Sequence, residues 1–330
     1  MQILKQNRKT GFACLFVVIG TLVTSCGNQT ARRPDQPAKP NIEWGVGVYP
    51  WHGLANVNPD DWDDAFIRGR RVGTIAHLEV TYGEISLQVA EVLYDIKVPR
   101  ARKIGMDVFM QINTFGTIPT DMGDFKNFCL ALAAKYKPEY ICIGQEINYV
   151  YDNNPAAAYR AFISELLELY RRVKTISPST VCTPSFSYES VRAKHQEFLF
   201  DDFREIVPFL PITSYPLKAF DMYPGYLYEL PKDIPPDYWN GSGLSDRDIF
   251  VTETGWSTDP HFRGSRQQQA DYVEKVYQMV RSNPRIKKVV WIVLTDVVSE
   301  STTIDREYPG TMGFFTIDGE EKPAWSLISG

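Results

Sequence analysis

Eight apolar, β-rich runs recur along this chain of 330 residues, and helical patterns separate them. Most of the runs are continuous rather than alternating in polarity, which is typical of parallel strands that are covered on both faces. Eight such strands alternating with helices predict an α/β fold, namely a single-domain (β/α)8 TIM barrel, which typically needs ~250 residues. The runs lie at residues 44–50, 72–80, 107–113, 140–148, 180–188, 209–216, 248–256 and 289–296.

The segments between the runs carry the start signals and the periodicity of helices. At Asn58-Pro59 and again at Asn154-Pro155, a capping residue precedes a proline, a combination that begins many helices. Pro99 falls inside one helical pattern, so we expect that helix to be kinked or to end early. The clearest helical patterns lie at residues 87–104, 124–136, 156–174, 267–280 and 322–329.

An open, doubly wound sheet is the alternative architecture for such an alternation. That fold normally has a glycine-rich phosphate-binding loop directly after a strand. The sequence contains neither a GxGxxG nor a GxxxxGK[ST] motif, and this favours the barrel.

The first 25 residues have the pattern of a signal peptide, with basic residues near the start and then an apolar run from Gly11 to Val23. The four residues that end at Cys26 resemble the lipobox of bacterial lipoproteins, which implies cleavage before Cys26 and attachment of lipid to its thiol. Gly27 follows, and we therefore expect a lipid anchor in the outer membrane of a Gram-negative bacterium. An ordinary signal peptide with an incidental cysteine is the alternative. Residues 26–40 would form a polar tether and residues 41–330 the barrel.

Charge and residue counts argue against several classes of partner. The formal net charge of −5 gives no sign of a nucleic-acid partner. The four histidines lack the spacing of a metal site, and no motif requires a cofactor, so we expect neither metal nor cofactor. We expect the protein to be a monomer.

Two carboxylates stand at the C-terminal ends of predicted strands, where the chemistry of such barrels gathers. Glu146 belongs to the fourth run and Glu253 to the seventh, so both should reach one mouth of the barrel. Two such groups can cleave a glycosidic bond, because one protonates the leaving oxygen while the other attacks the anomeric carbon or activates water. Glu253 could instead be a buried acid that is paired with Arg71 or Arg160.

The order of these motifs resembles the retaining β-glycosidases on (β/α)8 barrels that are called clan A. Members place an acid/base Glu at the end of strand four and a nucleophile Glu at the end of strand seven, and this chain has IGQE at 143–146 and TETGW at 252–256. Its sixth strand ends SYP at 214–216, similar to the clan's Tyr-Pro, whose Tyr contacts the nucleophile. The resemblance implies that Glu146 is the acid/base and Glu253 the nucleophile.

Within the clan, GQEIN at 144–148 is most similar to the arabinogalactan endo-β-1,4-galactanases. One position departs from the clan's pattern, because Gln145 stands where an Asn usually binds the sugar 2-hydroxyl. Gln offers the same donor and acceptor, one methylene further out. It could bind the same hydroxyl, serve a different ring, or mark a barrel that binds glycan without cleaving it well.

Further residues near the strand ends are candidates for contact with substrate, and each has a packing role as its alternative. Glu79 and Glu84 could add a further acid at the mouth, although we expect a solvated rim there. The aromatic-rich segment at 217–245 could form a substrate wall or a lid held by its own cluster. The candidate substrate-binding residues are Gln145, Tyr215, Trp256, Trp291, Asn113, Asn148 and Trp51.

Taken together, these patterns predict an exported, lipid-anchored, retaining β-glycoside hydrolase that acts on a β-linked poly- or oligosaccharide through two Glu side chains. The alternative is a non-catalytic glycan-binding lipoprotein on the same barrel. A structural envelope protein with a vestigial cleft is a third interpretation.

Overall fold

A computed structural model describes residues 38–48, 59–114, 116–218, 225–240, 246–297 and 308–330. The predicted signal peptide, Cys26, most of the tether and Trp51 lie outside these ranges. Within them, no helix combines the length and the apolar character that crossing a membrane requires.

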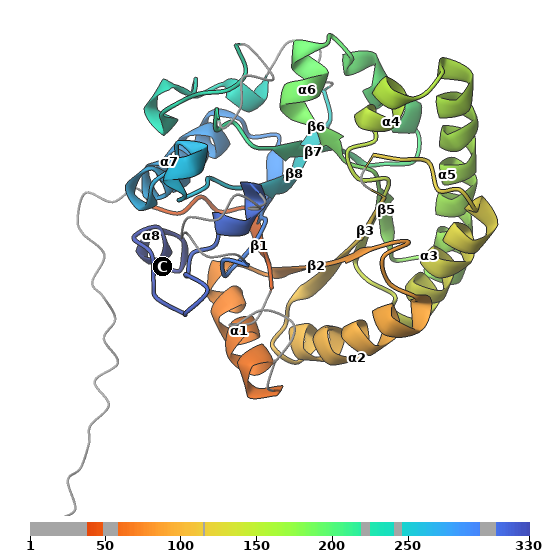
Figure 1. The fold of residues 1–330 in the computed structure, drawn as a ribbon, viewed down its shortest axis with the longest axis horizontal. Helices are drawn as coiled ribbons and strands as arrows, with labels where there is room; N and C mark the ends of the chain where they lie inside the picture. Colours follow the sequence, from red (N-terminus) through yellow and green to blue (C-terminus); the bar gives the residue numbers. More distant parts are fainter. Residues whose placement is uncertain (1–37, 49–58, 115, 219–224, 241–245, 298–307) are drawn as a thin grey trace, which may run out of the picture. The chain divides into compact units, whose positions relative to one another are not determined.

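Nine parallel strands form one sheet, in the order β5-β4-β3-β2-β1-β9-β8-β7-β6. All nine fall on or next to the predicted runs, so the α/β barrel expected from the sequence is confirmed (Figure 1). The strands are β1 (Glu43–Gly47), β2 (Ile75–Thr81), β3 (Asp107–Asn113), β4 (Tyr140–Ile143), β5 (Val181–Thr183), β6 (Phe186–Ser187), β7 (Phe209–Ser214), β8 (Asp248–Thr254) and β9 (Ile286–Trp291).

The chain itself closes the ring, at Pro184 and Ser185. β5 and β6 stand at the two ends of the sheet order, yet these two residues are all that separates them in the chain. Proline has no N–H to give to a ladder, so it interrupts the fifth predicted strand. The nine strands are therefore the eight strands of the barrel, with the fifth divided into two halves.

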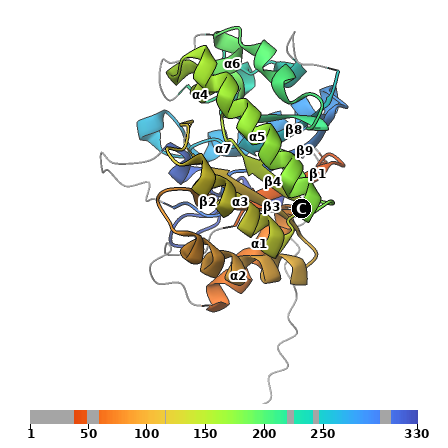
Figure 2. The same cartoon turned by 90° about the vertical axis from the view of Figure 1, so that its right-hand side faces the viewer.

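Helices follow most of the strands and form the outer layer (Figures 1 and 2). The helix with Pro99 inside it does not end early, because α2 continues four residues further to Lys103. Asn154 does not cap α5 as expected; its Nδ2 donates to the carbonyl of Val150, 2.8 Å away, near the end of α4. The α-helices are α1 (Pro59–Val72), α2 (Leu87–Lys103), α3 (Met122–Tyr136), α4 (Asn148–Asn153), α5 (Ala156–Ile176), α6 (Tyr188–Ala193), α7 (Arg266–Ser282) and α8 (Trp325–Ile328).

An aromatic layer fills the part of the barrel interior that lies below the C-terminal mouth, towards the start of the strands. Phe250 of β8 lies 5.3 Å from Phe109 of β3 and 5.6 Å from Tyr140 of β4, ring centre to ring centre. His77 of β2 stacks on Phe109 at 5.0 Å. Because strand side chains alternate between faces, the next inward residues of β2 and β3 are Glu79 and Gln111, which lie towards the C-terminal mouth.

Candidate active site

A β-bulge in β8 turns Glu253 towards the interior. Val251 is the register partner of Ile212 on β7, but the next partner of β7, Thr213, pairs with Glu253, so Thr252 is an extra residue. Without the bulge, with Thr252 paired like its neighbours, strict alternation from the inward-facing Phe250 would point Glu253 outward. Bulges commonly re-aim a side chain beside an active site, and Glu253 is 2% exposed here.

Three donors hold the carboxylate of Glu253. The hydroxyl of Tyr215 donates to Oε2 at 2.7 Å, the amide of Gln111 donates to Oε1, and the amide of Gln145 lies 3.4 Å from Oε1. The contact from Tyr215 is the one that the clan resemblance implies. Sequence reasoning missed Gln111, although a glutamine in the middle of an apolar run is the signal that could have found it.

Glu146 lies beyond its strand, which corrects the predicted boundary. β4 ends at Ile143, and the chain then turns through Gly144 at φ +95° and Glu146 at φ +47°. The loop is fixed to the divided fifth strand, because the backbone N–H of Glu146 donates to Oγ of Ser185 at 2.9 Å. A non-glycine residue in this left-handed region is uncommon, and such residues cluster at functional sites.

A threonine links the two carboxyl groups. The hydroxyl of Thr213 donates to Oε1 of Glu146 at 2.8 Å, and Thr213 is itself the register partner of Glu253. Gln145, next to Glu146 in the chain, contacts Glu253 directly. The structure therefore brings Glu146, Gln145, Tyr215 and Glu253 together at one mouth of the barrel.

The surroundings of the two carboxyl groups favour protonation of Glu146 over protonation of Glu253. Burial, and then the negative charge of Glu253, raise the pKa of Glu146 to about 7, against one opposing hydrogen bond from Thr213. Burial also raises the pKa of Glu253, but Tyr215, Gln111 and Gln145 all stabilise its ionised form. Because Glu253 has three donors and Glu146 has one, a proton shared by the pair resides on Glu146.

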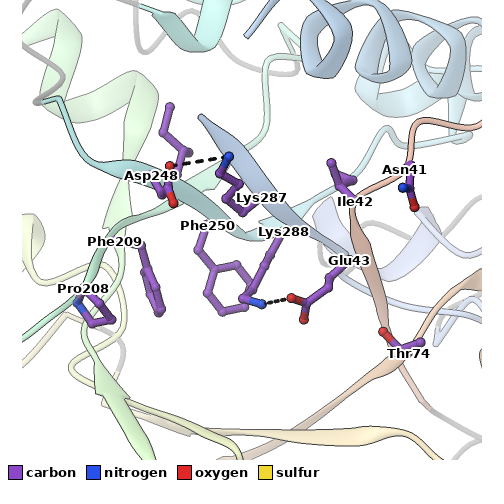
Figure 3. A pocket seen from close by; sticks show the side chains of 11 residues that line it. Asn41, Ile42, Glu43, Thr74, Pro208, Phe209, Asp248, Phe250, Lys287 and Lys288 are labelled. Carbon is purple, nitrogen blue, oxygen red and sulfur yellow. Dashed lines mark hydrogen bonds and ion pairs between the residues drawn. The ribbon is translucent and has the colours of Figure 1, made fainter. Parts of the chain in front are cut away.

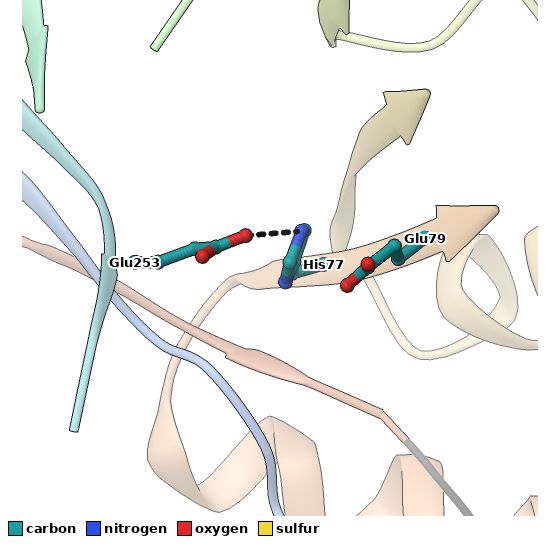
Figure 4. A group of neighbouring side chains, drawn as sticks. All are labelled: His77, Glu79 and Glu253. Carbon is teal, nitrogen blue, oxygen red and sulfur yellow. Dashed lines mark ion pairs between the residues drawn. The ribbon is translucent and has the colours of Figure 1, made fainter. Parts of the chain in front are cut away.

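His77 lies beside Glu253 and is neutral. Its Nε2 is 3.8 Å from Oε1 of Glu253, and burial lowers the pKa of His77 to about 4 (Figure 4). With Glu79, these side chains bring three potential metal-ligand atoms within 4.8 Å of one another. The spacing of histidines in the sequence does not reveal this group. The carboxylate of Glu253 already accepts three hydrogen bonds, which suits a polar network better than a cation.

Two of the tryptophans singled out from the sequence pack into the core. Trp256 is 0% and Trp291 1% exposed, so neither offers a free face to a sugar ring. Trp256 lies 5.2 Å from Tyr272 of α7, and Trp291 lies 4.9 Å from Phe314, ring centre to ring centre. Trp291 also donates from Nε1 to the carbonyl of Met312 at 3.0 Å. Both therefore fill the layer between the barrel, α7 and the C-terminal segment.

Of the two asparagine candidates, one lies at the mouth of the barrel and the other has a structural contact. Oδ1 of Asn148 accepts from the backbone N–H of Ser187 at 2.8 Å, so this side chain joins the start of α4 to β6. Asn113 lies at the mouth, where its Nδ2 donates to Glu79. Arg71 lies 4.9 Å over the ring of Trp325, and no arginine or lysine in the described ranges forms an ion pair with Glu253.

Two aromatic residues of the segment at 217–245 are anchored behind β7. The hydroxyls of Tyr238 and Ser214 donate to Oε1 of the buried Glu189, at 2.9 and 2.7 Å. Trp239 donates from Nε1 to Oγ of Ser214 at 2.9 Å. These contacts hold Tyr238 and Trp239 against β7 through Glu189, which the sequence did not single out. Whether the segment forms a substrate wall or a lid stays a prediction, since residues 219–224 and 241–245 lie outside the described ranges.

A cavity of about 610 Å³ opens at the other end of the barrel, where the strands begin (Figure 3). Lys288 pairs there with Glu43, and Nζ of Lys287 lies 3.8 Å from a carboxylate oxygen of Asp248. The N-terminal face of such barrels generally serves stability rather than chemistry. This cavity is separate from the carboxylate site.

Comparison with known proteins supports the fold. No family model matches the sequence, and no curated protein matches it. A variant of a GH5_18 protein from Streptomyces cattleya, in complex with Manβ1-4GlcNAc, superposes with a TM-score of 0.63 at 14% identity, covering 87% of this chain and 79% of that one. A GH5_18 protein from Bifidobacterium longum subsp. infantis gives 0.61 at 15% identity, covering 87% and 77%.

A β-glucuronidase from Bacteroides uniformis gives a TM-score of 0.60 at 16% identity, and the match covers 89% of this chain but 35% of that one. These proteins are glycoside hydrolases, and at such low identities the likeness establishes the barrel fold alone.

Proposed function

We propose that this protein is a retaining β-glycoside hydrolase in which Glu253 is the nucleophile and Glu146 the acid/base. The observation that carries the proposal is the unequal hydrogen bonding of two neighbouring carboxyl groups. Glu253 accepts from three donors and so stays ionised, whereas the pKa of Glu146 is raised to about 7. One group is thus prepared to attack an anomeric carbon and the other to protonate a leaving oxygen.

The charge of the pair would change during the reaction in the way that a double displacement needs. When Glu253 forms a glycosyl ester, its negative charge disappears, and the pKa of Glu146 falls because that charge is one of its causes. Glu146 can then take a proton from the water that hydrolyses the ester. A retaining mechanism requires the carboxyl groups to stand ~5–5.5 Å apart.

The substrate would be a β-linked poly- or oligosaccharide. Galactan belongs in the test panel because GQEIN at 144–148 is similar to endo-galactanases. Manβ1-4GlcNAc belongs there because a structural neighbour was solved with it. Mannan and mixed-linkage glucan complete the panel.

The test is turnover of this panel by residues 41–330, compared with Glu253→Gln and Glu146→Gln. We expect Glu253→Gln to lower kcat by at least ~10³-fold, since the covalent step is lost. A 2-deoxy-2-fluoro glycoside should label Glu253, as located by mass spectrometry of peptides, and the first product should keep the β configuration. Release of the α anomer would contradict a retaining mechanism.

A non-catalytic glycan-binding barrel is the second candidate, and Gln145 favours it. In this protein the amide of Gln145 faces Glu253, in place of the clan's Asn. A glycan that binds equally well to the wild type and both Glu→Gln variants, without turnover of any glycan, would support this alternative.

We also propose that the protein is exported and lipid-anchored through Cys26 to the outer membrane. The support is the sequence pattern ahead of the barrel. Metabolic labelling with a palmitate analogue, lost in Cys26→Ala, tests the anchor.

A further inference from the structure

Glu79 lies inside the mouth rather than on the solvated rim expected from the sequence. It follows His77 by two residues on β2, so both side chains face the barrel interior, and Figure 4 shows them on the side of the strand that faces Glu253. Its register partner is Gln111, the residue that donates to Glu253. One carboxylate oxygen of Glu79 lies within 4.8 Å of ligand atoms of His77 and Glu253.

The charge of this mouth is negative. Three carboxyl groups line it, and in the described part of the chain no lysine or arginine pairs with Glu146 or Glu253. His77 is neutral near pH 7 because burial lowers its pKa to about 4. Burial lowers the pKa of Lys97 to about 8, and the nearby Glu79 opposes that shift by attraction, so Lys97 remains a cation at neutral pH.

Two polar side chains near Glu79 have unused hydrogen-bonding capacity. Oδ1 of Asn113 has no hydrogen-bond partner, and the approaches of the His77 ring to Gln111 and to the backbone of Ile292 fall short of hydrogen-bond geometry. The side chains of His77 and Asn113 are both 0% exposed, and Asn113 already donates to Glu79 through its amide. A neutral imidazole and an amide oxygen are satisfied by hydroxyl groups, which both donate and accept.

We propose that Glu79 binds hydroxyl groups of the sugar unit held against Glu253, and that this subsite takes neutral sugars and rejects uronic acids. The inference rests on the proposed function of the same site. A carboxylate can accept from two neighbouring hydroxyls at once. A uronic acid would instead bring a further carboxylate into a buried mouth beside Glu79 and Glu253, where repulsion is poorly screened.

The test uses pairs of 4-nitrophenyl β-glycosides that differ at C6 alone: glucoside with glucuronide, and galactoside with galacturonide. For the wild type we expect kcat/KM to be at least 100-fold higher for the neutral member of the better pair. Turnover of a uronide within threefold of its neutral partner would overturn the inference while leaving the hydrolase proposal intact. This comparison does not depend on the folding of a variant.

Glu79→Gln identifies the residue responsible. We expect it to lower kcat/KM for the neutral glycoside at least tenfold and to narrow the preference over the uronide at least tenfold. Glu84→Gln is the matched control, because it makes the same charge change at an exposed position just beyond β2, and it should alter neither value. An unchanged preference in Glu79→Gln would overturn the assignment to this residue.

Binding separates the inference from the proposed function if nothing is cleaved. Calorimetry with deoxynojirimycin and its 6-carboxylate counterpart then measures the same preference without turnover. At least tenfold tighter binding of the neutral compound, lost in Glu79→Gln, would uphold the subsite while the hydrolase proposal fails. Equal binding of the two, or binding of neither, would overturn the inference.

Discussion

At the scale of single residues, Glu146 combines a strained backbone with a shifted pKa. Its φ of +47° places it in the left-handed region, which costs most L-residues ~1 kcal/mol or more. No sequence pattern indicates this, because β4 ends at Ile143, five residues before the end of the predicted run. The strain lets a residue outside the strand turn its carboxyl group back to the mouth.

The variant Glu146→Gly should therefore be more stable than the variant Glu146→Ala. Glycine adopts a positive φ without a clash of its Cβ, and this outweighs its larger entropy in the unfolded chain. We expect Glu146→Gly to exceed Glu146→Ala by ~0.5–1 kcal/mol in the free energy of unfolding, measured by urea denaturation. Equal stabilities, or a more stable alanine variant, would contradict the strain.

The raised pKa of Glu146 also predicts how stability depends on pH. The group titrates at 4.5 in the reference state and at about 7 in the folded protein, so the folded protein retains a proton that the unfolded chain releases between these values. Stability from this group is full below pH 4.5 and is lost as the pH rises towards 7.

Glu146→Gln removes this titration. Because the side chain is partly exposed, we expect the variant to gain on the order of 1–2 kcal/mol over the wild type at pH 8 and nothing comparable at pH 4. Denaturation curves at both pH values measure the difference. A constant difference between the two proteins would show that burial does not shift this group.

Residue by residue, the sequence predicted the groups that have a recognisable neighbourhood and missed those without one. Glu146, Glu253 and Tyr215 lie in motifs, and the structure places them together. Gln111 and His77 are single polar residues within apolar strands. Their contacts with Glu253 depend on how the strands are arranged in the barrel, which the sequence does not show. Trp256 and Trp291 are residues of the kind that lines sugar sites, but both lie in the core. The sequence alone does not show towards which side of the barrel wall a side chain points.

At the scale of elements, the bulge in β8 decides where the candidate nucleophile points. Thr252 is the extra residue, and its hydroxyl donates to the carbonyl of Ile212 at 3.0 Å. After the bulge, Thr254 faces outward and its hydroxyl lies 2.6 Å from that of Tyr272 on α7. The sequence gives no sign of this irregularity, since Thr252 is as suitable for a regular strand as its neighbours.

Deletion of Thr252 should remove the bulge and leave Glu253 facing the interior, because Glu253 then stands two positions after the inward-facing Phe250. We expect turnover to persist and the free energy of unfolding to fall by ~1 kcal/mol or more, since the hydrogen bond of the Thr252 hydroxyl is lost. Thr252→Ala is the matched control, because it removes the hydroxyl but keeps the extra residue. It should retain most of the activity and lose ~1 kcal/mol. A deletion variant without turnover would mean that the extra residue does more than set the direction of Glu253.

The sequence predicted some boundaries of strands and helices correctly and others wrongly. The predicted third strand, 107–113, matches β3, which follows the turn at Gly105. The fifth predicted strand contains Pro184, and the structure shows the interruption that a proline inside a strand should have indicated. Asn154 closes α4 rather than capping α5, since the sequence does not reveal that two helices meet there.

At the scale of the whole molecule, a buried ion pair joins the C-terminal segment to the barrel. Nζ of Lys322 lies 2.7 Å from Oδ2 of Asp296, beyond the end of β9, with side chains that are 0% and 1% exposed. Asp296 also accepts from the backbone N–H of Gly313 at 2.9 Å. These contacts hold the segment that carries Phe314 and Trp325 against the barrel.

Removing one member of this pair should be costly, and removing both should be less so. Lys322→Met leaves a buried carboxylate without its cation, and we expect a loss of ~3 kcal/mol. Adding Asp296→Asn should restore at least half of it, since the amide oxygen still accepts from Gly313. Thermal and urea unfolding measure both variants. Additive losses in the double variant would mean that the two charges do not depend on each other.

The barrel as a whole was predictable from eight apolar runs, because a parallel sheet needs both faces covered and this leaves few architectures. What the pattern could not supply is the way in which the ring closes. Closure depends on two short half-strands and on a proline, not on another long ladder. The predictions for residues 1–37 and for Trp51 fall outside the described ranges and stay predictions.

The divided fifth strand gives the two halves of the barrel different mechanical stiffness. β6 shares two register pairs with β7, and β5 shares three with β4, whereas β7 and β8 share six. Segments with few ladder bonds open first in local fluctuations. The loop of Glu146 is hydrogen-bonded to Ser185, between the two short half-strands, whereas Glu253 lies on β8, which is paired with β7 over six positions. Under the proposed mechanism, the loop of Glu146 would therefore adjust to leaving groups of different size, while Glu253 keeps its position.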